Sequence, residues 1–528
     1  MHRTQNWEIR KPPAASRGGI VAAQNGTAAR IGAEVLKAGG SAVDAVVATA
    51  FALAAVEPWS SGLGGIGHLV VHQAGADRAV SIDFGPIAPS RLDPAAYPLS
   101  AERRTELFTW SQGVVGDHNI RGPLSFVIPS AVRGYGLAIE RFGRLPWREL
   151  VKPAIMLARS GLPVDWFTTL KVANAAADLQ RYEESRRIWL PHGLPPVCPP
   201  DGDIPSLPLG RLADTMERLA EAGPDDFYTG EIARSIAADT QTAGGFLSAD
   251  DLAQYQARIV RALEIPYRGV AFQTTPGMTA GPTLAQVLGQ LAEERFSSAP
   301  DADYFEALAD ALQQAYAKRL DSMGDVENGV ATSTTHITAS DRQGGIAALT
   351  TTLLSMFGSH YVLPGTGILM NNGMMWFDPR PDRPNSIAPG KRALTNMCPV
   401  VVARGGQPWF GVGASGGRRI LAAVLQMASF IVDFGMNPEA AAHHPRIDVS
   451  GGERIGIDRR LSAAIIERLL ARPGAALAEH TVHPDRFARP NLVLRDADGW
   501  SHGISDVMSP WSAAVAPAAR ERPRIPTQ

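Results

Sequence analysis

Hydroxyl side chains are concentrated in two short runs of the sequence, 333–341 and 344–352. In the first run Thr334, His336 and Thr338 alternate with other residues, which is the period of a β-strand, and the intervening Arg-Gln-Gly-Gly suits a tight turn. The runs therefore predict a β-hairpin. Threonine favours strands, so these hydroxyls can serve structure alone. Alternatively, a threonine at the start of the first strand is a nucleophile that becomes N-terminal when the chain cuts itself just before it.

The composition excludes several classes of protein. A net charge of -2 over 528 residues leaves no basic surface of the kind that binds nucleic acid or an anionic membrane. Cys198 and Cys398 are too few for a disulfide framework and form no close metal-binding pair, and we expect neither a metal nor a cofactor. The first residues lack a secretory apolar region, and the longest apolar run, 45–56, is too short to span a bilayer. We expect a cytoplasmic protein.

Caps and helix breakers predict several helices around the hairpin. Ser41 should cap an apolar helix over 42–56, and Pro153 should begin a helix that ends before Gly161. Further helices are predicted over 28–38, 129–142, 210–222, 229–242, 248–255, 283–294, 303–320 and 420–434. From residue 330 onward β-prone runs dominate, and 414–420 turns from a strand into a helix. The pattern indicates stacked α and β layers, an α+β fold.

A series of short segments resembles the gamma-glutamyltransferase family of N-terminal-nucleophile hydrolases. The segments are 39–45, 62–65, 129–134, 142–147, 247–252, 334–336, 357–359, 371–374, 389–392 and 416–417. The resemblance covers nearly the whole chain and implies a four-layer αββα sandwich and a precursor that cleaves itself before Thr334. The products would be a large segment, 1–333, and a small segment, 334–528. We expect the two to stay associated as one interleaved globular unit.

The resemblance also implies roles for residues around the cut. A threonine hydroxyl needs a base, and the α-amine of Thr334, once it is N-terminal with a pKa near ~8, can be that base. Thr335 is the adjacent alternative, but its side chain should face away across the strand. Thr352 matches a threonine that hydrogen-bonds the nucleophile. Gly416 and Gly417 match a pair whose N–H groups form an oxyanion hole, although the turn alone would also favour glycines.

Thr395 and Asn396 match two hydroxyl-bearing positions that hold the substrate carboxylate, the second being an amide here. Four other positions that recognise a glutamyl group are altered. By the resemblance, an arginine falls at Gly85, a carboxylate at Trp376, and an asparagine and a glutamine at Leu354 and Gly373. Glycine and tryptophan cannot rebuild those ion pairs, so we expect a more apolar acyl pocket, unless Arg91, Arg133 or Arg418 supplies a charge.

The sequence thus predicts a self-processing threonine amidohydrolase. Its substrate would be a small non-glutamyl amide, with oxamate or a cephalosporin-type side chain as candidates and water or an amine as acceptor. One alternative is a true γ-glutamyl hydrolase or transferase with relocated contacts. Another is an unprocessed, catalytically silent binding protein, because the segment before residue 334 is short for this family.

Overall fold

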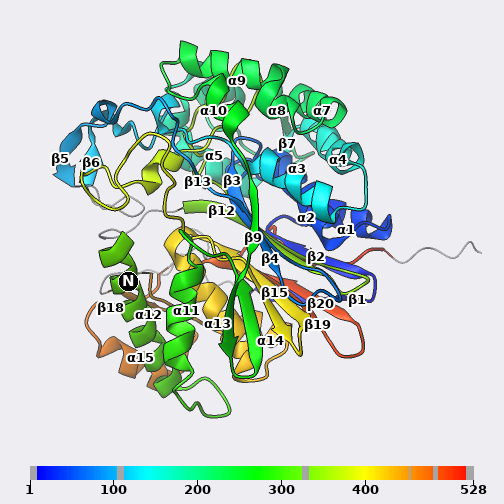
Figure 1. Ribbon diagram of the computed structural model, residues 1–528, viewed down its shortest axis with the longest axis vertical. Coiled ribbons are helices and arrows are strands. Elements are labelled where there is room, and N and C mark those ends of the chain that lie inside the picture. Colours follow the sequence, from blue (N-terminus) through cyan, green and yellow to red (C-terminus); the bar gives the residue numbers. More distant parts are fainter. Residues whose placement is uncertain (1–8, 104–111, 324–331, 451–453, 480–485, 519–528) are drawn as a thin grey trace, which may run out of the picture.

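The computed structural model describes residues 9–103, 112–323, 332–450, 454–479 and 486–518. Two seven-stranded antiparallel sheets lie face to face, and helices cover the outer face of each (Figure 1). This is the four-layer αββα sandwich of the α+β class that the resemblance implies. In the described part of the chain, no helix combines the length and the apolar character needed to cross a bilayer.

The hairpin sheet contains the threonine hairpin at its centre. In order, its strands are β21 (Ala513–Val515), β2 (Gly19–Ala23), β12 (Thr332–Asp341), β13 (Ile346–Ser355), β3 (Ile66–His72), β4 (Val80–Phe84) and β9 (Arg258–Arg261). The second sheet consists of β1 (Ala14–Ser16), β20 (Ser501–Ser505), β19 (Arg489–Arg495), β15 (Gln407–Ser415), β14 (Val400–Arg404), β11 (Val270–Thr274) and β10 (Leu263–Tyr267). Both sheets combine strands from before and after Thr334.

Two groups of helices form the outer layers. The hairpin sheet is covered by α1 (Gly26–Lys37), α2 (Ala42–Val56), α3 (Ala131–Phe142), α4 (Trp147–Ser160), α5 (Trp166–Leu179), α6 (Glu183–Trp189), α7 (Leu212–Ala222), α8 (Asp226–Thr229), α9 (Glu231–Thr242) and α10 (Ala249–Gln254). The second sheet is covered by α11 (Gly281–Leu291), α12 (Ala302–Met323), α13 (Ile420–Val432), α14 (Pro438–His443) and α15 (Ala463–Leu470). Short peripheral strands are β5 (Leu99–Arg103), β6 (Gln112–Val114), β7 (Leu162–Pro163), β8 (Ser206–Leu207), β16 (Ile447–Asp448), β17 (Ile455–Ile457) and β18 (Ala475–Leu477).

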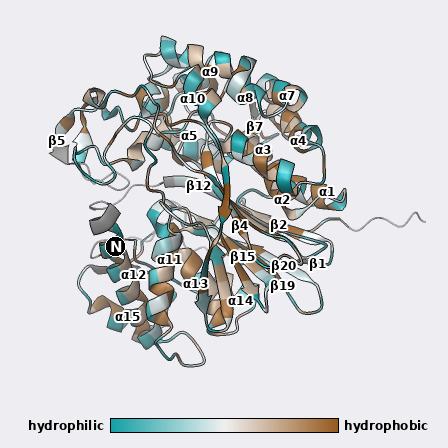
Figure 2. Ribbon diagram, viewed as in Figure 1, coloured by the Kyte–Doolittle hydropathy of each residue, from teal (hydrophilic) through white to brown (hydrophobic). Residues whose placement is uncertain are grey.

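Apolar residues fill the spaces between the layers. One large cluster lies between the hairpin sheet and its helices, and a second lies between the other sheet and α11–α15. Smaller clusters, with Val70, Ala348 and Val401 among them, join the two sheets. Figure 2 shows the consequence, with hydrophilic stretches on outer helices such as α9 and apolar ones among the central strands. Every residue of α2 is buried, and this helix packs directly against the hairpin sheet.

Candidate active site

The hairpin places Thr334 at an irregularity. Strands β12 and β13 pair antiparallel, but the register shifts between Ser333 and Thr335, because Thr334 alone faces Thr352 and Leu353 of β13 in a β-bulge. Its Oγ1 lies 3.1 Å from Oγ1 of Thr352. Thr335 is paired with Thr351, whose hydroxyl accepts a hydrogen bond from Tyr135 on the helical side of the sheet. The two adjacent threonines therefore face opposite sides, as predicted, and Thr334 faces the space between the sheets.

Thr352 joins the nucleophile candidate to the peptide bond that precedes it. Its hydroxyl donates to the carbonyl oxygen of Ser333 at 2.7 Å and accepts from the backbone N–H of Leu354 at 2.8 Å. Because the single hydroxyl hydrogen of Thr352 points at Ser333, the contact with Thr334 must use the Thr334 hydrogen. Thr352 thus polarises the Ser333 carbonyl and orients the Thr334 hydroxyl at the same time.

Leu354 has an unusual backbone conformation next to this contact. Its φ is +86°, in the region that bulky L-residues rarely adopt. Neighbouring hydrogen bonds hold the segment in place: Leu353 N–H donates to Ser60 O at 3.0 Å, and Asn372 N–H donates to Leu353 O at 3.1 Å. These hydrogen bonds offset the strain at Leu354, and strained residues held in this way are common at functional sites.

Gly416 and Gly417 occupy the predicted turn between β15 and α13. Their φ values are +138° and +61°, both in the region that favours glycine. The turn lies against β12, and Gln24 connects the two: its side-chain amide contacts Ser415 Oγ, and in the orientation that satisfies its neighbours the amide nitrogen lies 3.2 Å from Thr334 O. The structure therefore brings the glycine pair beside Thr334, while its oxyanion role stays a prediction.

An apolar cluster contains two of the altered positions. Trp376, at the end of the 3-10 turn Gly373–Trp376, and Leu354 are buried together with Ile66, Ala393 and Met397. Gly373 has a packing reason of its own, because a Cβ there would lie 2.4 Å from Val127 Cγ2. We call this cluster the apolar wall; that it faces the acyl group of a substrate stays a prediction.

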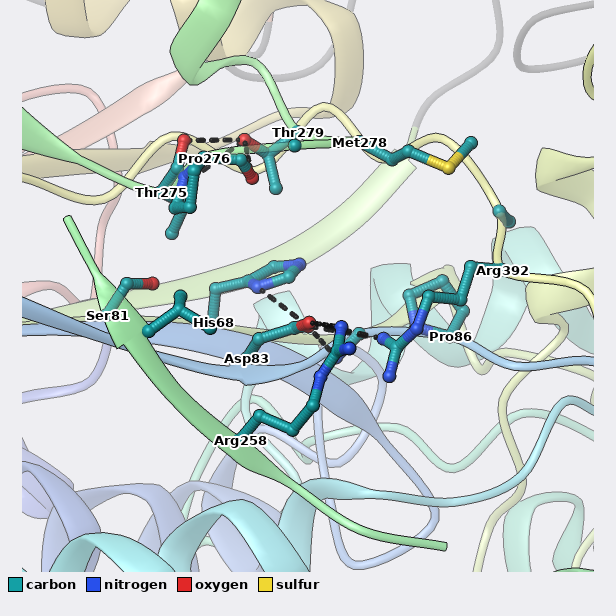
Figure 3. Close-up of a pocket in the computed structure, with 14 residues that line it drawn as sticks. His68, Ser81, Asp83, Pro86, Arg258, Thr275, Pro276, Met278, Thr279 and Arg392 are labelled. Carbon is teal, nitrogen blue, oxygen red and sulfur yellow. Dashed lines mark hydrogen bonds and ion pairs between the residues drawn. The ribbon is translucent and has the colours of Figure 1, made fainter. Parts of the chain in front are cut away.

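Gly85 lines a neighbouring pocket of about 270 Å³, which contains charged side chains and shares Ala393 with this cluster (Figure 3). Asp83 in this pocket pairs with Arg258 at 2.7 Å and with Arg392 at 3.2 Å, and His68 Nδ1 lies 3.6 Å from its carboxylate. Burial opposes ionisation of Asp83, but His68 and the two arginines together lower its pKa to about 2. Charged side chains therefore lie in the pocket that contains Gly85, and the expectation of a more apolar acyl pocket stays a prediction.

The arginines suggested as substitutes do not line this pocket. Arg91 pairs with Asp250 on the surface, and Arg133 pairs with Asp225 and lies over the Tyr228 ring. The arginines that do line it are Arg258 and Arg392.

Arg319 is a site residue that the sequence reasoning missed. It is buried and donates to Thr395 O at 2.6 Å, to Thr279 O at 2.7 Å and to Asn396 Oδ1 at 3.4 Å. Burial lowers its pKa to about 10. Since Arg319 uses the amide oxygen of Asn396, the NH₂ group is the donor that Asn396 can offer to a ligand. The sequence does contain a signal for Arg319: it lies three residues after Tyr316, so the two share one face of α12, and that face is buried.

Comparisons with known sequences show which proteins this chain resembles. The sequence profile described as Gamma-glutamyltranspeptidase matches residues 28–333 and 327–516. The glutathione hydrolase proenzyme of Escherichia coli (strain K12) is 30% identical over 554 residues, covering 94% of this chain and 91% of that protein. The acylase ACY 1 proenzyme of Pseudomonas sp. (strain SE83) is 29% identical over 513 residues, covering 89% of each.

A solved structure shows the same fold. The cephalosporin acylase from Bacillus halodurans has a TM-score of 0.83 to this chain, covers 98% of it with 99% of its own length, and is 24% identical in sequence. The profile spans most of the sequence, and the relatives are matched over nearly their full length. The chain belongs to the gamma-glutamyltranspeptidase family and is an enzyme of the N-terminal-nucleophile amidohydrolase type.

Proposed function

We propose that this enzyme cuts its own chain before Thr334 and then uses Thr334 to hydrolyse a small non-glutamyl amide. The observation that carries the proposal is the position of Thr352, whose hydroxyl contacts both Thr334 Oγ1 and the Ser333 carbonyl oxygen. A nucleophile and the carbonyl that it would attack are thus held by one side chain. The proenzyme names of the Escherichia coli and Pseudomonas relatives support processing of this kind.

After the cut, the α-amine of Thr334 serves as base for its own hydroxyl, because an α-amine ordinarily has a pKa near ~8. The hydroxyl attacks the substrate carbonyl, the amine leaves, and an acyl ester on Thr334 is released by water or by an amine acceptor. The Gly416 and Gly417 N–H groups stabilise the negative charge on the carbonyl oxygen, at ~3 kcal/mol per donor. The segments 1–333 and 334–528 remain together because both sheets combine strands from the two segments.

The substrate assignment rests on the apolar wall of Trp376 and Leu354, where the family resemblance places polar groups. An acyl group without an α-amine fits that wall, and oxamate or a cephalosporin-type side chain is the candidate. A γ-glutamyl substrate is the second candidate. It is favoured by the glutathione hydrolase relative and by Arg392, which lines the pocket at Gly85 and could meet a carboxylate if it exchanged Asp83 for the ligand.

Denaturing gel electrophoresis of the purified protein tests the processing. Two fragments of roughly 36 and 21 kDa, at ~110 Da per residue, are expected, and Thr334→Ala should give one band of 56.2 kDa without activity. Thr335→Ala is the matched control and should still be cut. A wild-type chain that stays intact and inactive would instead support the non-catalytic binding protein, and a Thr334→Ala variant that still hydrolyses amides would exclude Thr334 as the nucleophile.

A panel of amides on processed enzyme tests the substrate. We expect oxamate and short acyl anilides to be hydrolysed with higher kcat/KM than a γ-glutamyl anilide. If the wild-type enzyme instead prefers the γ-glutamyl anilide and Arg392→Gln loses that preference, a γ-glutamyl compound is the substrate.

A further inference from the structure

Glu57 is a buried carboxyl group close to the bond that is to be cut. It follows directly after α2 and is 4% exposed. Its Oε1 lies 3.0 Å from Ser60 Oγ, whereas Oε2 has no hydrogen-bond partner among the residues that the structure describes. A buried carboxyl with only one of its oxygens satisfied is unfavourable for stability alone, so a role in chemistry has to be considered.

Short contacts connect this carboxyl to both sides of the peptide bond. Ser60 Oγ lies 2.8 Å from Ser333 Oγ, and Ser333 supplies the carbonyl carbon of the bond. On the other side, the Gln24 amide nitrogen lies 3.3 Å from Glu57 Oε1 and 3.2 Å from Thr334 O. Glu57, Ser60 and Ser333 therefore form a continuous row of oxygens that ends at the residue next to the Thr334 nitrogen.

The surroundings keep a proton on Glu57 near neutral pH. Burial raises its pKa to about 7, against the opposing effects of Arg489, Ser60, Lys171 and Trp59. When the carboxyl is neutral its O–H can donate to Ser60, and the hydroxyls of Ser60 and Ser333 can both turn toward Thr334. When it is ionised the direction reverses, because Ser60 then donates to the carboxylate.

We propose that Glu57 supplies, through Ser60 and Ser333, the proton that the Thr334 nitrogen needs when the chain cuts itself. This inference rests on the proposed self-cleavage and adds the general acid that the precursor lacks, since an amide nitrogen is a poor leaving group until it is protonated. Glu57 acts through other side chains and is a positioning and proton-supplying residue. Its function ends before turnover begins.

Self-cleavage exchanges the amide bond before Thr334 for an ester bond. Thr334 Oγ1 bonds to the Ser333 carbonyl carbon while its proton passes to Thr352 and the Thr352 proton passes to the carbonyl oxygen. The C–N bond then breaks, and its electron pair stays on nitrogen. The nitrogen gains the Glu57 proton and the proton that leaves the oxygen as the carbonyl re-forms. The products are an ester on Thr334, an α-ammonium group and the Glu57 carboxylate; water then hydrolyses the ester.

The test is the pH dependence of cleavage of the full-length chain made by cell-free translation, pulse-labelled and followed on denaturing gels. Wild-type cleavage should slow as pH rises above about 7, because Glu57 loses its proton there. Glu57→Gln keeps the shape and cannot donate an acidic proton. It should cleave about 10²-fold or more slowly and lack the decline at higher pH. Ser60→Ala should be slow as well, whereas Ser61→Ala, its buried neighbour outside the row, should cleave at the wild-type rate.

Circular dichroism at the temperature of the assay establishes that each variant is folded. Equal rates and pH profiles for wild type and Glu57→Gln would overturn the inference, and so would equal slowing in Ser61→Ala, which would indicate a packing effect. These results differ from failure of the proposed function, in which the wild-type chain itself would not be cut or Thr334→Ala would be.

Discussion

Thr352 lies opposite Thr334 across the hairpin, and their hydroxyl oxygens are 3.1 Å apart although eighteen positions separate them in the chain. The regular register of the hairpin, in which Thr335 pairs with Thr351, sets Thr352 opposite Thr334, and the extra residue of the bulge lies on β13, directly after Thr352. The same hydroxyl reaches the Ser333 carbonyl. One side chain therefore contacts both the carbonyl and the hydroxyl that the proposed self-cleavage would join.

Thr352→Val should slow both self-cleavage and amide hydrolysis. Valine keeps the shape but removes the donor to Ser333 O and the acceptor for the Thr334 hydroxyl, and loss of one such donor typically lowers a rate ~10²- to 10³-fold. Rates of fragment formation and of turnover measure the effect. Thr351→Val, on the opposite face of the same strand, is the control and should leave both rates near the wild-type values. Similar losses in the two variants would contradict a specific role for Thr352.

Alanine at Gly416 should be far more harmful than alanine at Gly417. A Cβ on Gly416 would lie 2.8 Å from the Ala488 Cα, and the backbone φ of +138° is itself unfavourable for alanine. We expect a loss of about 3 kcal/mol or more in the free energy of unfolding of Gly416→Ala, together with little processed protein. Gly417, with φ of +61°, should lose about 1–2 kcal/mol. Urea denaturation and gels compare the two, and an equal tolerance of alanine would show that the turn is more adaptable than its geometry indicates.

Trp376→Leu should shift acyl preference toward longer chains. The indole is buried in the apolar wall, so a smaller side chain leaves room there, at a cost of about 2–4 kcal/mol in stability. The measurement is kcat/KM for anilides with acyl chains of increasing length. Trp189→Leu removes another buried tryptophan, on the helical side near Phe357, and should cost stability without changing the preference. An unchanged preference in Trp376→Leu would place the acyl group elsewhere.

The stability of the enzyme should fall with acid in a way that depends on His336. Burial lowers the pKa of His336 to about 3, whereas in the unfolded chain it is about 6.5. Between these pH values the unfolded state binds a proton that the folded state excludes, so the free energy of unfolding decreases as pH falls, by up to about 1.4 kcal/mol per pH unit. In His336→Gln the difference in stability between neutral pH and about pH 4 should be smaller. Urea denaturation at the two pH values measures this difference in the free energy of unfolding. If it is equal in wild type and His336→Gln, His336 is not the cause of the acid sensitivity.

Local chemistry explains what could be predicted of the fold. Helix α2 runs from Ala42 to Val56 as predicted, because Ser41 and Asp44 form a capping box that the sequence displays. The prediction for Pro153 was wrong, since α4 begins at Trp147 and includes the proline. Tertiary contacts prevail there: the Trp147 ring packs edge-on against Phe51 at 5.3 Å, and its indole N–H donates to Leu219 O. No pattern within a single helix reveals such contacts.

Some residues of the candidate site could be predicted from local sequence, and others could not. Thr334 and Thr352 belong to one hairpin, so strand pairing alone places them together. Gln24, Glu57 and Arg319 come from distant segments, and their approach to the site depends on how the layers stack. The charged groups in the pocket at Gly85 were not foreseen for that reason, because His68, Asp83 and Arg258 meet across three neighbouring strands. Family resemblance located the altered positions, but only packing shows that Gly85 lies beside charged side chains while Trp376 and Leu354 lie in the adjoining apolar cluster.

Each sheet combines strands from before and after Thr334, and this determines how many molecules take part in folding. The uncut chain folds as one molecule, so its stability does not depend on concentration. Once the bond before Thr334 is broken, an unfolded molecule becomes two separate polypeptides, whose strands must find each other again in a bimolecular encounter. Recovery of activity after denaturation should therefore decline on dilution for the processed enzyme, whereas recovery of the folded state of Thr334→Ala should not. The proposed function thus requires that folding precede the cut, and it predicts that complete unfolding of the processed enzyme is hard to reverse.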